Sequence, residues 1–102
     1  MVLLEFSITP LGEGESVSQY VAEAVKLIDA SGLDYQTHAM GTIVEGELDQ
    51  VLGLLRQCIE AMAVHSNRVS VVAKLDYRHG YQGRLKSKVA SVEQKLGRPI
   101  KK

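Results

Sequence analysis

Alternating apolar and polar residues open the chain and predict a β-strand over residues 2–9. One face of this segment is wholly apolar and carries Val2, Leu4, Phe6 and Ile8. The other face is mixed and carries Leu3, Glu5, Ser7 and Thr9. Residues 69–77 alternate in the same way, with Val69, Val71, Ala73 and Leu75 on one face and Ser70, Val72, Lys74 and Asp76 on the other. A period of two is typical of a strand, so both segments are predicted to lie in a sheet.

Two shorter extended runs, residues 35–39 and 42–45, flank Met40-Gly41 and predict a β-hairpin. Three other segments repeat apolar residues with the helical period of 3.6. The first follows a Ser16-x-x-Gln19 capping box, ends near Gly32, and has the stripe Val17, Val21, Ala24, Val25 and Ile28. The second opens near Gly46 and has the stripe Leu48, Val51, Leu52, Leu55, Ile59 and Met62. The third ends at Gly97 and Pro99, and its inward positions are Leu85, Val89, Val92 and Leu96.

The predicted order of elements is β-α-β-β-α-β, followed by an extra C-terminal helix. This order is typical of the α+β ferredoxin-like sandwich, with an antiparallel sheet in the strand order 4-1-3-2. A chain of 102 residues has room for one such domain, residues 1–102. We expect helices on one sheet face only. The other face is too apolar at Leu3 and Val72 to stay in water, so we expect it to stack against a second subunit in a homo-oligomer.

Composition narrows the classes of function. Twelve basic and twelve acidic residues give no net charge, which argues against a nucleic-acid partner. Neither a signal peptide nor a long apolar run is present, so we expect a cytoplasmic protein with no membrane contact. The single cysteine, Cys58, lies in an apolar helical pattern and is predicted to be a buried, inert thiol.

Motifs for catalysis and for metal binding are weak. Gly12-Glu13-Gly14-Glu15 resembles a phosphate loop but lacks its lysine, and its carboxylates would repel a phosphate. The three histidines lie on three different elements, which predicts no metal site. A cluster of Glu5, Glu45, Lys74 and Asp76 on the mixed sheet face is more simply explained by ion pairing than by acid-base catalysis. The chain also lacks the aromatic, cysteine and arginine motifs of the RNA-binding, metallochaperone and acylphosphatase proteins that share this fold.

The stretch from Met40 to Glu47, Met-Gly-Thr-Ile-Val-Glu-Gly-Glu, places a hydroxyl and a carboxylate in an apolar strand. Together with the segments from Phe6 to Gly12 and from Val71 to Arg78, it resembles the small thiamine-binding family. The similarity runs from Val2 to about Leu96. It implies a ferredoxin-like subunit that assembles through its sheets into dimers and tetramers. It also implies binding of thiamine or its hydroxymethylpyrimidine half, without established catalysis and without a cofactor.

The residues are chemically compatible with such a ligand. An aminopyrimidine ring has an amine donor and ring-nitrogen acceptors, which Thr42 and Glu45 are predicted to match, with Ser7 on the neighbouring strand. Met40 and Ile43 are candidates to provide an apolar surface against which the ring packs. The residues predicted to contact the positively charged thiazolium ring are Glu45, Asp76, Tyr35 and Tyr77. Lys74 or Arg78 would suit a phosphorylated form of the ligand, or would neutralise the nearby acidic residues.

The sequence therefore predicts a carrier, buffer or sensor of thiamine or its pyrimidine precursor, in a sheet-stacked oligomer that is a dimer of dimers. Two alternatives stay open. The chain could be a structural or regulatory oligomer that binds a protein partner through its outer sheet face. It could also be a small hydrolase or isomerase that uses Glu45 and Asp76, which predicts a bell-shaped pH dependence of turnover.

Overall fold

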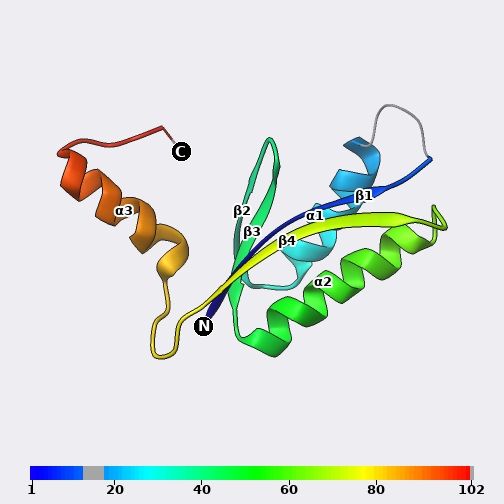
Figure 1. Cartoon of the computed structure of the whole chain (residues 1–102), viewed down its shortest axis with the longest axis horizontal. Coiled ribbons are helices and arrows are strands. Elements are labelled where there is room, and N and C mark those ends of the chain that lie inside the picture. Colours follow the sequence, from blue (N-terminus) through cyan, green and yellow to red (C-terminus); the bar gives the residue numbers. More distant parts are fainter. Residues whose placement is uncertain (13–17, 102) are drawn as a thin grey trace.

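The computed structural model describes residues 1–12 and 18–101 (Figure 1). Its elements are β1 (Val2–Pro10), α1 (Ser18–Ala30), β2 (Asp34–His38), β3 (Gly41–Gly46), α2 (Leu48–Ala63), β4 (Val69–Tyr77) and α3 (Arg84–Leu96). This order confirms the predicted β-α-β-β-α-β arrangement with an added helix. The predicted capping residue Ser16 and the stripe residue Val17 lie outside the described residues.

The four strands form one antiparallel sheet in the order β2-β3-β1-β4, which is the predicted order counted from the other edge. The register aligns Leu4 with Val44 on β3 and with Leu75 on β4. It also aligns Leu3 with Glu45 on one side and Asp76 on the other. The sheet therefore has a helix face, which carries Leu4 and its alternating neighbours, and an outer face, which carries Leu3 and its neighbours.

The core lies between the helix face and the helices α1 and α2. Its fully buried members come from both layers: Val2, Leu4, Ile28, Val44, Val51, Cys58 and Met62. The predicted stripe of α2 is partly wrong, because Leu54 and Cys58 are buried while Leu48 and Leu52 are exposed. The run from Leu52 to Leu55 contains three leucines, so it allows two rotational settings of the helix. Packing of Val51, Leu54, Cys58 and Met62 at helical spacing selects one of them.

Helix α3 departs from the prediction. It stands apart from the rest of the fold in Figure 1, and it meets the body through its first turn, where Arg84 and Leu85 are buried. The predicted inward residues Val92 and Leu96 are instead 53% and 49% exposed. The end of the helix is as predicted, because Gly97 adopts a φ of 83° and donates its N–H to the Glu93 carbonyl at 2.8 Å. In the described part of the chain, no helix is both long enough and apolar enough to cross a bilayer.

Candidate functional site

Two threonine hydroxyls face each other across the β2–β3 hairpin. Thr37 and Thr42 are register partners on the helix face, and their Oγ1 atoms are 3.0 Å apart. Thr42 is only 5% exposed and lies opposite Phe6 of β1. Gly41 allows this close approach, since a Cβ at this position would lie 2.8 Å from the Phe6 carbonyl oxygen. The glycine at the turn therefore lets β3 carry Thr42 tightly against β1.

A cavity of about 320 Å³ opens between α1 and this hairpin. We call it the hydroxyl pocket. Its apolar lining comes from β1 and α1 and includes Phe6, Ile8, Val21, Ala24 and Ile28. Its polar lining comes from β1 and the hairpin and includes Ser7, Thr9, Thr37, His38 and Thr42. A small cavity with an apolar wall and a few converging polar groups is the usual form of a site for a small organic molecule.

The tip of the hairpin is held by His38. Its Nδ1 accepts a hydrogen bond from the Met40 backbone N–H at 3.2 Å. Its Nε2 lies 3.3 Å from Oε2 of Glu5, on the outer face. Because Nδ1 accepts this hydrogen bond, a neutral ring carries its hydrogen on Nε2, the atom that faces Glu5. These contacts orient the hairpin tip, where the Met40 side chain is 82% exposed at the margin of the pocket.

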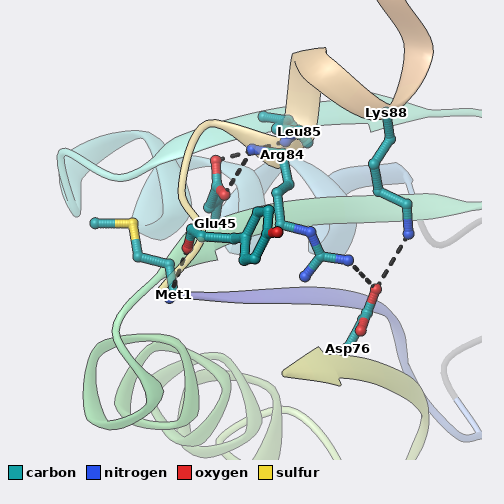
Figure 2. A network of polar contacts seen from close by, with 7 residues as sticks. Met1, Glu45, Asp76, Arg84, Leu85 and Lys88 are labelled. Atoms are coloured by element: carbon teal, nitrogen blue, oxygen red, sulfur yellow. Dashed lines mark hydrogen bonds and ion pairs between the residues drawn. The ribbon is translucent and has the colours of Figure 1, made fainter. Parts of the chain in front are cut away.

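Glu45 has a different environment. Figure 2 shows its carboxylate directed at the beginning of α3. The backbone N–H of Arg84 donates to Oε2 at 2.9 Å, and that of Leu85 donates to Oε1 at 3.5 Å. The N-cap residue of α3 is Gly83, which has no side chain with which to cap the helix. Glu45 therefore supplies from β3 the acceptor that the free N–H groups and the positive helix end favour.

Asp76 of β4 extends this network (Figure 2). It binds the Arg84 guanidinium and also accepts from Lys88 Nζ at 3.1 Å. The hydrogen bonds from Lys88 and Arg84 hold the pKa of the Asp76 carboxyl below its usual range. Arg84 is 6% exposed, and it contacts Glu45 through its backbone N–H and Asp76 through its guanidinium. In the sheet register, Leu3 of β1 lies between Glu45 and Asp76, so Arg84 lies across Leu3. The outer face is thus covered at this end, which corrects the prediction that helices cover one sheet face only.

The structure does not bring all the predicted ligand residues together. Thr42 and Glu45, which are predicted for one site, point to opposite faces of the sheet, because residues three apart on a strand alternate in this way. Ser7 and Met40 do lie with Thr42 at the hydroxyl pocket. Ile43, Lys74 and Asp76 line a separate hollow of about 380 Å³ on the outer face. Tyr77 is 59% exposed at the end of β4 and lines neither hollow.

Sequence reasoning missed Thr37 as a site residue. Counting residues back from the predicted Met40-Gly41 turn pairs Thr37 with Thr42. The hairpin prediction was therefore enough to identify Thr37. It also missed Arg84, whose role depends on where α3 begins. Cys58 is as predicted: the thiol is fully buried, and burial raises its pKa to about 11, so it stays protonated and unreactive at neutral pH.

The fold is ferredoxin-like, and its hydroxyl pocket has the form that is usual for a small-molecule site. The family model described as "Thiamine-binding protein" matches residues 4–93. A relative in Mycobacterium tuberculosis is 44% identical over 99 residues, which cover 96% of this chain and 97% of the relative. That relative is named only as a member of an uncharacterised protein family. The chain belongs to the family of thiamine-binding proteins.

Solved structures agree with this fold. A hypothetical protein from Methanocaldococcus jannaschii has a TM-score of 0.83 and 33% identity, and the match covers 91% of this chain and 96% of the other. A candidate thiamine biosynthesis or salvage protein from Thermotoga maritima has a TM-score of 0.78, with 89% of this chain and 97% of the other covered. Its identity is 20%, so this second likeness shows the fold alone.

Proposed function

We propose that this chain binds thiamine or its hydroxymethylpyrimidine half in the hydroxyl pocket, without converting it chemically. The proposal rests chiefly on the Thr37–Thr42 hydroxyl pair, which stands beside an apolar wall in a chain of the thiamine-binding family. The cavity of about 320 Å³ falls within the range of roughly 300–1,000 Å³ that is usual for small-molecule sites. The protein would then act as a carrier, buffer or sensor.

The hydroxyl pair matches the polar edge of an aminopyrimidine. One hydroxyl donates its hydrogen to the other, so the pair keeps one free O–H donor and several acceptor lone pairs. A ring nitrogen can accept from the free O–H, and the exocyclic amine can donate to a lone pair. Phe6 and Ile28 offer apolar surface to the ring, and the flexible side chain of Met40 can close over it. Ile43 lies on the outer face, so we do not assign it to this pocket.

Replacing Thr42 with valine tests the hydroxyl pair. The change keeps the shape of the buried side chain and removes one hydrogen-bonding group, so affinity for thiamine is expected to fall by about 0.5–1.5 kcal/mol, or roughly two- to twelvefold. Isothermal titration of thiamine and of hydroxymethylpyrimidine measures the change. Ser70→Ala is the matched control, because it removes an exposed outer-face hydroxyl on β4 and should leave affinity unchanged. Wild-type affinity in Thr42→Val would remove the hydroxyl pair from the site.

The charges of the pocket predict selectivity among forms of the vitamin. Among the described residues that line it there is no lysine, arginine, aspartate or glutamate. A phosphate ester placed there would lose hydration without gaining a cationic partner. We therefore expect thiamine diphosphate to bind at least about tenfold more weakly than thiamine, which corresponds to roughly 1.4 kcal/mol. Competition titration measures this ratio, and tighter binding of the diphosphate would contradict the assignment of the pocket.

We further propose that two subunits stack through the open part of the outer face, as a step toward a dimer of dimers. Val72 is 71% exposed there, and it is the register partner of Ser7. Glu5 and Lys74 are register partners in the same region. An apolar side chain flanked by paired polar groups is suited to a contact between subunits.

Val72→Asp places a carboxylate at the centre of this face, and desolvating that carboxylate should oppose stacking. Sedimentation velocity is expected to show a smaller species than the wild type at the same micromolar concentration. Val64→Asp introduces the same charge at a residue that is 82% exposed after α2, and it should sediment as the wild type does. Equal sedimentation of Val72→Asp and the wild type would count against stacking through this face.

The exposed Val72 also supports a second candidate function, a regulatory oligomer that binds a protein partner through the outer face. The two functions differ in their response to a small molecule. A thiamine titration that gives no heat up to high micromolar concentration would favour the second function over the first.

A further inference from the structure

Ala39 and Met40 form a two-residue turn at the tip of the β2–β3 hairpin, because the register pairs His38 with Gly41 (Figure 1). Two-residue hairpins favour the I′ and II′ turns, which have a positive φ at the first central residue or at both. In the part of the chain that the structure describes, only glycines have a positive φ, and neither turn residue is a glycine. The turn therefore lacks the backbone geometry that matches the twist of its strands, so a side-chain contact becomes important for holding it.

His38 supplies such a contact. Its Nδ1 accepts a hydrogen bond from the backbone N–H of Met40, two residues further along the chain, at 3.2 Å. Asparagine and aspartate hold turns through the same contact, from a side-chain oxygen to the N–H two residues on. Histidine differs from them, because it commonly takes up a proton between about pH 5 and 8. A proton on Nδ1 turns this acceptor into a donor, so only the neutral ring can hold the turn.

The surroundings of His38 give a charged ring a partner. The side chain is 44% exposed, and its Nε2 lies 3.3 Å from Oε2 of Glu5 on β1. Lys74 on β4 is the register partner of Glu5. Lys86 and Glu93 of α3, which have opposite charges, line the other side of the groove that His38 borders. A protonated ring would thus gain an ion pair at Nε2 while it loses its acceptor at Nδ1.

The turn adjoins the two hydroxyl groups of the hydroxyl pocket. Thr37 and Thr42 form the next register pair inward from the turn, and their Oγ1 atoms are 3.0 Å apart. Both threonines line the pocket together with His38 and Met40. A turn that loosens therefore changes the spacing of the hydroxyls and the position of Met40, which are the groups proposed to meet the ligand.

We infer that His38 is a positioning residue whose neutral ring holds the hydroxyl pocket in its binding form, so that acid weakens ligand binding there. The inference rests on the proposed function, since it concerns the same pocket. Protonation of the ring removes the acceptor for the Met40 N–H, and the tip of the hairpin is then no longer held. It also places a positive charge at the margin of the pocket, which disfavours a ligand that carries the cationic thiazolium ring. Both effects lower affinity for thiamine in acid.

The first measurement needs no ligand. NMR signals of the Met40 backbone amide and of the His38 ring are followed in isotope-labelled protein between about pH 8 and pH 5.5. In the wild type, the Met40 signal is expected to move together with the signal of the His38 ring. In His38→Asn the Met40 signal should stay in place, because asparagine keeps an acceptor for this N–H and does not titrate in this range. A Met40 amide that stays in place in the wild type while the His38 ring titrates would overturn the inference.

Isothermal titration with thiamine at the same two pH values measures the effect on the pocket. Between the higher and the lower pH, affinity of the wild type should fall about threefold more than that of His38→Asn, as expected for the loss of one hydrogen bond. Comparing the two proteins at each pH cancels the protonation of thiamine itself. At the higher pH, His38→Asn should bind thiamine more tightly than His38→Ala, because only asparagine supplies an acceptor. His65→Asn is the matched control, since His65 also pairs with a carboxylate, Glu23 at 2.9 Å, but does not line the pocket.

The His65→Asn control should show the same fall in affinity as the wild type. Equal falls in the wild type and in His38→Asn would overturn the inference and leave the proposed function intact, since binding itself would be observed. Heat from neither protein at either pH would instead remove the proposed function, and this inference with it. Equal affinities of His38→Asn and His38→Ala at the higher pH would also overturn the inference, because the acceptor would then have no effect on the pocket.

Discussion

Replacing Phe6 with alanine is expected to lower the free energy of unfolding by about 3–5 kcal/mol. Phe6 is 3% exposed and lies in the central strand, between Thr42 on β3 and Ala73 on β4. It belongs to the main core cluster and also lines the hydroxyl pocket. Removing the ring leaves a cavity that the two flanking strands cannot close. Because a domain of this size is usually stable by only about 5–15 kcal/mol, the variant should be close to unfolding even without denaturant.

Urea unfolding followed by circular dichroism measures this loss. Val64→Ala is the control, because this side chain is 82% exposed and its truncation should change stability by no more than about 0.5 kcal/mol. Where Phe6→Ala still folds, its affinity for thiamine should also fall, since one wall of the pocket is gone. A loss below about 1 kcal/mol would mean that β1 is not packed in the core as described.

Replacing Glu45 with glutamine is expected to release the first turn of α3. The carboxylate is 5% exposed and accepts hydrogen bonds from two backbone N–H groups of that turn. Losing hydrogen bonds to a charged acceptor costs about 1.5–3 kcal/mol, so the amides of residues 84–88 should exchange with solvent roughly ten- to a hundredfold faster. Affinity for thiamine should be unchanged, because Glu45 points away from the hydroxyl pocket.

Native-state hydrogen exchange measures this opening residue by residue. Glu47→Gln is the matched control: it makes the same chemical change two residues later, at an exposed N-cap of α2, and should leave exchange in α3 as it is in the wild type. Unchanged protection of Arg84 and Leu85 in Glu45→Gln would contradict the capping role. A fall in thiamine affinity would move the ligand to the outer face.

The sequence is sufficient to predict the sheet, because apolar and polar residues alternate along its strands. The apolar sets of residues 2–9 and 69–77 could face only one core, and this fixed both the strands and their faces. The helices were less well determined. Alternative apolar positions in α2 leave its rotation open. The stripe of α3 predicts an inward face along the whole helix, whereas only its first turn, Arg84 and Leu85, is buried.

The sequence predicts several residues that line the hydroxyl pocket, but it does not predict which of the candidate residues lie together. Thr42, Ser7 and Met40 do meet at one cavity, whereas Glu45, which is close to them in sequence, points to the other sheet face. The two-residue alternation of a strand places Thr42 and Glu45 on opposite faces, so the same hairpin both lines the hydroxyl pocket and caps α3. The role of Glu45 could not be predicted without knowing that α3 begins at a glycine that has no side chain for capping.

The most direct measurement is a thiamine titration of isotope-labelled protein, followed through its backbone amide signals by NMR. The proposed function predicts that signals from Thr37, Gly41 and Thr42 move together and saturate, while those of Lys74, Asp76 and Arg84 stay in place. Shifts confined to Lys74, Asp76 and Arg84, with none at Thr37 or Thr42, would contradict binding in the hydroxyl pocket.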